Sequence, residues 1–121
     1  MTTATIDELG TRICTLLEYL PVMRATIADI EEAEVLARAV IALRDQKEPQ
    51  RLGGSLEIAY WEDRIALFLA MKEAISFLTL RLRRNQMAIV ILASIVLVVN
   101  PLHDQARAMR QQIQRAPKDT L

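Results

Sequence analysis

Apolar residues recur at intervals of three and four along most of the chain, which is the spacing of one face of an α-helix. The first apolar stripe begins at Ile6, directly after Thr5, and Thr5 and Glu8 have the spacing of a capping box. The second runs from Ile27 to Leu43, with acidic residues at its front and basic residues at its back, as the helix dipole favours. The pattern therefore predicts helices over residues 5–20 and 26–46.

The longest stripe lies in residues 55–82, which contain neither Gly nor Pro. It follows the segment 47–54, where Pro49 and the pair Gly53–Gly54 are typical of a loop, and Ser55 is a good N-cap. We therefore predict one long helix over residues 55–82. Its apolar side is formed by Ile58, Trp61, Ile65, Phe68, Ile75, Leu78 and Leu82.

Residues 87–99 are apolar on every side apart from Ser94. Such a helix is buried either in lipid or among other helices. As a helix it is only about 20 Å long, whereas a bilayer core is roughly 30 Å thick, so we expect a core helix that the other helices surround. Membrane insertion is the alternative. Because Pro lacks the interior hydrogen bond, we expect a break at Asn100–Pro101, a short helix over residues 101–115 and a frayed tail at 117–121.

These elements define a single all-α domain over residues 1–121, an antiparallel bundle of four to five helices. Leu67, Leu69, Phe77 and Leu80 add apolar surface that one small bundle cannot cover. Large exposed apolar patches usually mark contacts, so we expect self-association to complete the bundle, as a homodimer in the commonest case. We assign six residues to the core or to the oligomer contact: Ile65, Phe68, Ile75, Leu78, Ile91 and Ile95.

The composition narrows the classes of function. Hydrophobic residues make up 52% of the chain, and 15 Lys and Arg balance 15 Asp and Glu. Balanced charge and the lack of helix-turn-helix spacing argue against a nucleic-acid-binding protein. The acidic N-terminus lacks the features of a signal peptide, so we expect a cytoplasmic protein, with membrane association as the alternative.

Residues for catalysis are scarce. No Gly-x-Ser-x-Gly elbow is present, and a single His and a single Cys are too few for a zinc or di-iron site. We therefore expect no metal, no cofactor and no enzymatic activity; a bundle enzyme built from Glu and Arg is a further alternative. Cys14 has apolar neighbours and is expected to be buried as a small hydrophobe. His103 is expected near the surface, bonded to Asp104 or to the backbone.

Lys72 and Glu73 interrupt the apolar run of the long helix. We expect both side chains to point outward into solvent. The alternative is a buried charge pair between helices or subunits, which would fix the register of the contact.

The best candidates for a binding surface are aromatic and arginine side chains, because Trp, Tyr and Arg dominate interaction hot spots. Core packing is the alternative role for Trp61. The sequence thus predicts a self-associating regulatory or adaptor module that binds or sequesters a partner protein. The residues assigned to partner binding are Tyr60, Trp61, Arg81, Arg83 and Arg84.

One short window resembles a known family. Gly53–Gly54 followed by Ile58, Tyr60 and Glu62 at the start of a long helix resembles the quorum-sensing antiactivator TraM. Proteins of that family are small helical dimers that sequester a transcription factor. The resemblance covers one loop–helix junction, so it implies a kind of task, sequestration of a protein, and assigns no family to this chain.

Overall fold

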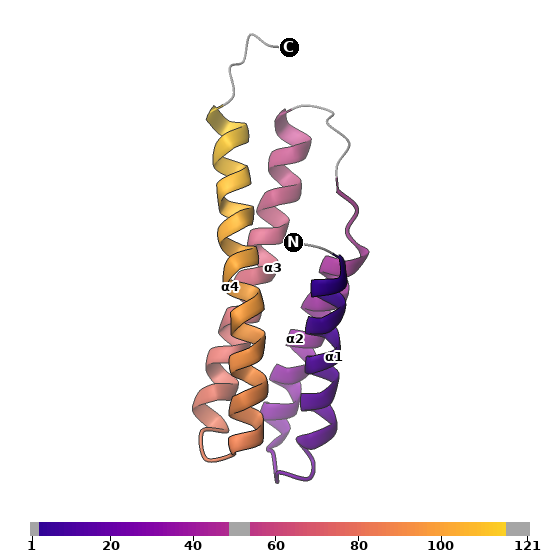
Figure 1. The fold of residues 1–121 in the computed structure, drawn as a ribbon, viewed down its shortest axis with the longest axis vertical. Coiled ribbons are helices and arrows are strands. Elements are labelled where there is room, and N and C mark those ends of the chain that lie inside the picture. Colours follow the sequence, from indigo (N-terminus) through magenta and orange to yellow (C-terminus); the bar gives the residue numbers. More distant parts are fainter. Residues whose placement is uncertain (1–2, 49–53, 116–121) are drawn as a thin grey trace.

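The computed structural model describes residues 3–48 and 54–115, which form four α-helices and no strand. The helices are α1 (Thr3–Tyr19), α2 (Ile27–Asp45), α3 (Gly54–Arg81) and α4 (Gln86–Arg115). Each helix packs against its neighbour in the chain, and α4 closes the ring against α1. The expectation of an all-α antiparallel bundle is confirmed, with four helices (Figure 1).

The two halves of the bundle differ in length. Helices α3 and α4 contain 28 and 30 residues, whereas α1 and α2 contain 17 and 19. At 1.5 Å per residue the longer pair extends roughly 15 Å further. Figure 1 shows that the α1–α2 and α3–α4 turns lie together at one end, which we call the turn end. At the opposite end α3 and α4 project beyond the shorter pair.

Local hydrogen bonds fix the start of two helices at the turn end. Thr26 is the N-cap of α2: its Oγ1 accepts the backbone N–H of Asp29 at 3.2 Å, and the Asp29 carboxylate accepts the Thr26 N–H at 3.0 Å. At the start of α4, Asn85 Oδ1 accepts the Ala88 N–H at 3.1 Å. The α1–α2 turn closes through Arg24, whose φ of 57° is in the left-handed region.

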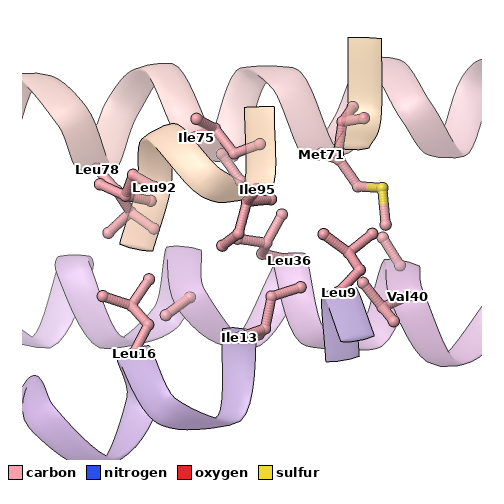
Figure 2. Close-up of a cluster of buried hydrophobic side chains, with 14 of the residues drawn as sticks. Leu9, Ile13, Leu16, Leu36, Val40, Met71, Ile75, Leu78, Leu92 and Ile95 are labelled. Carbon is pink, nitrogen blue, oxygen red and sulfur yellow. The ribbon is translucent and has the colours of Figure 1, made fainter. Parts of the chain in front are cut away.

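The core lies along the axis of the bundle and receives side chains from all four helices (Figure 2). Large aliphatic side chains and one methionine interdigitate there and are almost fully removed from solvent. Burial of each is worth about 1.5–3 kcal/mol, so this shared core is the main source of stability. Figure 2 labels Leu9, Ile13 and Leu16 of α1, Leu36 and Val40 of α2, Met71, Ile75 and Leu78 of α3, and Leu92 and Ile95 of α4.

Two expected caps are wrong, because each helix begins earlier than its cap residue. Helix α1 begins at Thr3, so Thr5 lies inside it, and α3 begins at Gly54, so Ser55 lies inside it. Each helix had been expected to start one or two residues later, at its capping residue. The predicted loop features at Pro49 and Gly53 and the predicted frayed tail 117–121 lie outside the described residues.

The expected break at Asn100–Pro101 is also wrong, since α4 continues through Pro101. The missing N–H of Pro101 leaves the Leu97 carbonyl without its usual helical donor. Val99 and Leu102, on either side of the proline, are both buried. Because Asn100 and Pro101 face solvent, the helix meets the core on both sides of the proline, and this packing offsets the local cost.

Helix α4 is not surrounded by the other helices, contrary to expectation. It packs on α3 and α1, and its buried face includes Ala88, Ile91 and Ile95. The opposite face is open: Val90 and Leu97 are strongly exposed. In a ring of four helices each member has one outward face, so an apolar sequence on all sides places apolar side chains at the surface.

Two further expectations about single residues are wrong. Cys14 is exposed, because it lies one position beyond the buried Ile13 and is rotated by about 100° from it. His103 is buried, with 6% of its surface exposed. This burial follows from the continuity of α4. The proline does not start a new helix, so His103 lies in the middle of α4, on the side that faces α3.

Candidate functional site

Tyr60 and Trp61 lie where α3 begins to project beyond α1 and α2. Their rings are 5.0 Å apart and nearly perpendicular, at 86°. The guanidinium carbon of Arg64, one helical turn further on, lies 4.8 Å from the centre of the Tyr60 ring and 5.8 Å from that of Trp61. These distances are within the range of cation–π attraction, so the three side chains form one cluster on the first turns of α3.

A pocket of about 230 Å³ opens beside this cluster at the end of the four-helix core. Its apolar wall includes Trp61 and Phe68, and its polar rim includes Gln46, Glu48 and Arg64. All four helices or their flanking residues contribute to it, because the shorter α1 and α2 end here while α3 and α4 continue. The remaining lining residues are Ile6, Leu43, Arg44, Leu102 and Gln105.

Among the described residues, two polar atoms of the pocket's rim lack a hydrogen-bond partner. They are Gln46 Oε1 and Arg64 Nε, both enclosed by neighbouring atoms. Burial raises the pKa of the Tyr60 hydroxyl, and the nearby Arg64 charge acts against that shift. Buried polar groups without hydrogen bonds destabilise the folded protein. A binding partner that supplies a donor to Gln46 Oε1 and an acceptor to Arg64 Nε would remove that cost.

The predicted arginines gather at the turn end, together with one that sequence reasoning did not select. Arg81, Arg83 and Arg84 line an open pocket of about 600 Å³ with Arg24 of the α1–α2 turn. Arg81 Nε lies 3.5 Å from the buried carboxylate of Asp29, which ties the end of α3 to the start of α2. Arg81 thus has a structural partner, whereas Arg24, Arg83 and Arg84 are exposed.

An apolar groove runs along the outside of the bundle between α3 and α4. One stretch is lined by Thr79, Ile89, Ala93, Val96 and Leu97, and the next by Lys72, Ile75, Ser76, Val96, Val99 and Asn100. The two stretches share Val96. This α3–α4 groove lies beside the core, since the buried residues Ile75 and Val99 form part of its floor.

The structure separates the residues assigned to the core from those at the surface. Phe68, Ile75, Leu78, Ile91 and Ile95 are buried in the core of a single copy, and Ile65 is half-buried. The surplus apolar surface lies elsewhere: Leu69 and Leu80 are exposed, whereas Leu67 and Phe77 are half-buried.

Lys72 is half-buried in the α3–α4 groove, and Glu73 is exposed. Lys72 also acts on His103 across the helix pair. Burial lowers the pKa of His103, and the positive charges of Lys72 and Arg107 lower it further, against the opposing effect of Asp104. These effects favour the neutral form of His103.

Within residues 3–48 and 54–115, no three His, Cys, Asp or Glu side chains come close enough to hold a metal ion. In the same range, α4 is the one helix long and apolar enough to cross a membrane by length and composition. Its most apolar 18-residue window has a mean hydropathy of 1.9, and 39% of that window is buried in the bundle.

Comparison of the chain with protein-family models, with curated proteins and with solved structures gave no match.

Sequence reasoning missed Arg24 and Arg64. Arg24 is separated from the other turn-end arginines by more than fifty residues, so only the pairing of the two turns brings them together. Arg64 did carry a signal, since it lies three and four residues after Trp61 and Tyr60 and so shares their side of the helix.

Proposed function

We propose that this chain is a non-enzymatic helical interaction module that self-associates through the outer face of α3 and α4 and binds a partner protein at the Tyr60–Trp61 cluster. The observation that carries the proposal is the apolar surface beside the α3–α4 groove. Leu97 is 76% exposed, Val90 62% and Leu69 of α3 45%. A stable monomer rarely displays several such side chains on two adjacent helices.

The size of this surface suits a modest dimer. Together the three exposed fractions equal about two fully exposed aliphatic side chains per copy, or about four in a symmetric pair. Burying them contributes roughly 6–12 kcal/mol. Association costs on the order of 4–15 kcal/mol in lost translational and rotational entropy. Because this cost is similar in size to the gain, self-association depends on this face and is sensitive to single charges placed in it.

The Tyr60–Trp61 cluster supports the second half of the proposal. Its two aromatic rings and its arginine have the character of an interaction hot spot. A partner segment that fills the adjacent pocket with an apolar side chain and pairs with Arg64 would bury both rings. Sequestration of a regulatory protein is the kind of task that this arrangement serves.

Size-exclusion chromatography with light scattering tests the self-association. We expect a molar mass of at least twice 13.7 kDa for the wild-type chain and a monomer for Leu97→Asp. The matched control is Ile41→Asp, which places the same charge at an exposed aliphatic position on α2. A monomeric wild type, or an equal effect of both variants, would refute the proposal.

A second candidate function follows from the apolarity of α4. Its hydropathy over 18 residues favours a membrane-associated protein anchored through residues 87–99. Leu97→Arg separates the two candidates, because Leu97 contributes nothing to the core of one copy. In cell fractionation, the membrane anchor predicts the wild type in the membrane fraction alone and Leu97→Arg in the cytosolic fraction. That result would favour the membrane anchor over the cytoplasmic interaction module.

A further inference from the structure

We infer that the turn end of the bundle docks on an anionic lipid surface, a property independent of self-association. Two turns distant in sequence meet there, and both carry the same two kinds of side chain. Residues 20–26 and 82–87 contain three arginines and no carboxylate. The same turns, with the first residue of α2, contain large aliphatic side chains that point into solvent.

The charge at this end is available to a ligand. Arg24, Arg83 and Arg84 are exposed and line the open pocket of about 600 Å³ between the two turns. Asp29 also lines this pocket, but it is buried and already paired with Arg81 at 3.5 Å. The pocket therefore offers guanidinium groups to an anion, and guanidinium binds phosphate oxygens through paired N–H donors.

The apolar side chains decide which anion fits. Val22 is 79% exposed and Ile27 is 76% exposed, and both flank Arg24 in the α1–α2 turn. Leu80 and Met87 are exposed on either side of Arg83 and Arg84. Aliphatic side chains between arginines suit a bilayer interface, where the headgroups are anionic and the acyl chains lie just below. A nucleic acid or an acidic peptide would leave these four side chains in water.

The fold presents the two turns as one surface. Both lie at the same end of the bundle in Figure 1, since α1–α2 and α3–α4 are antiparallel hairpins that start from the same side. The helix N-termini at this end are already capped by Thr26 and Asn85. The arginine side chains, rather than the helix ends, would hold the headgroup phosphates.

Flotation with lipid vesicles tests the inference on the full chain. We expect binding to phosphatidylcholine vesicles that contain about one third phosphatidylglycerol, and at least tenfold weaker binding to pure phosphatidylcholine. Arg83→Gln with Arg84→Gln should weaken binding about 30-fold, since each arginine near an anionic surface is worth about a factor of five. The matched control is Arg107→Gln with Arg115→Gln, which removes two exposed charges from the far part of α4.

Further arms separate the alternatives. Val22→Ser with Ile27→Ser should weaken vesicle binding at unchanged charge, and excess inorganic phosphate should not abolish it. Circular dichroism confirms that each variant is folded. The inference is overturned by equal binding to both vesicle types, by equal loss in both arginine pairs, by binding of a DNA oligonucleotide but not of vesicles, or by no binding at all. Leu97→Asp keeps vesicle binding if the inference holds, whatever its oligomeric state, so the two proposals fail separately.

Discussion

Replacing Pro101 with Ala should stabilise the protein. Pro101 is exposed in the middle of α4, so its ring contributes no core packing. In a helix interior Pro is about 3 kcal/mol less favourable than Ala, because it lacks an N–H and its ring crowds the preceding turn. Ala also gives the unfolded chain more freedom, which costs up to about 1 kcal/mol. The balance is a gain of about 2 kcal/mol.

Urea unfolding followed by far-ultraviolet circular dichroism measures this gain. With a slope of about 2 kcal/mol per M, the midpoint should rise by about 1 M. The control is Pro21→Ala, the same change in the α1–α2 turn, beyond the end of α1 rather than in a helix interior. There the lost rigidity of the unfolded chain should lower stability by up to about 1 kcal/mol.

A midpoint that stays the same or falls in Pro101→Ala would refute the reasoning. It would mean that α4 is bent at the proline and that the buried residues on both sides of it need the bend. A similar gain in Pro21→Ala would also refute it, since the effect would then come from the substitution itself rather than from its place in a helix.

Three other predictions concern the core, the turn end and His103. Leu78→Ala should lower the free energy of unfolding, measured in urea, by about 2–5 kcal/mol. Leu80→Ala, on the exposed side of the same helix, should lower it by less than about 0.5 kcal/mol. Similar costs for the two variants would contradict the observed register of α3. Asp29→Ala removes the capping bond and the ion pair and should lower the free energy of unfolding by about 1–2 kcal/mol. Arg81→Gln should cost less, because the Arg81 side chain is half exposed. The reverse order would show that the ion pair dominates. Because the folded state lowers the pKa of His103, the unfolded chain takes up a proton first as pH falls below about 6.5. The free energy of unfolding should therefore fall over that pH range, and it should fall less steeply in His103→Leu. Parallel pH profiles of the two proteins would refute this.

Local sequence pattern was enough to predict the helices. The three- and four-residue spacing of apolar positions marked the segments that became α1, α2 and α3, each to within two residues at either end. The capping box of Thr26 and Asp29 at the start of α2 is equally local, since a cap depends on atoms only three residues away. Such features are short-range, so the sequence carries them without reference to the fold.

The errors arose where long-range packing overrides a local preference. A proline normally ends a helix, yet Val99 and Leu102 reach the core on both sides of Pro101 and hold α4 together. The same continuity buried His103. The uniform apolarity of residues 87–99 predicted a surrounded helix, but a ring of four helices has no central position, so one side of α4 is left exposed.

The candidate sites, too, follow in part from the sequence alone and in part only from the tertiary structure. The chain by itself determined that Tyr60 and Trp61 share a helix with Arg64, because neighbours along a helix are fixed by its geometry. It also determined an excess of apolar side chains over what one small bundle can bury. Only the tertiary structure decided that this excess forms a face between α3 and α4 and that Arg24 joins Arg83 and Arg84 at one end. The physical reason is that hairpin packing brings together residues whose distance in sequence gives no sign of their contact.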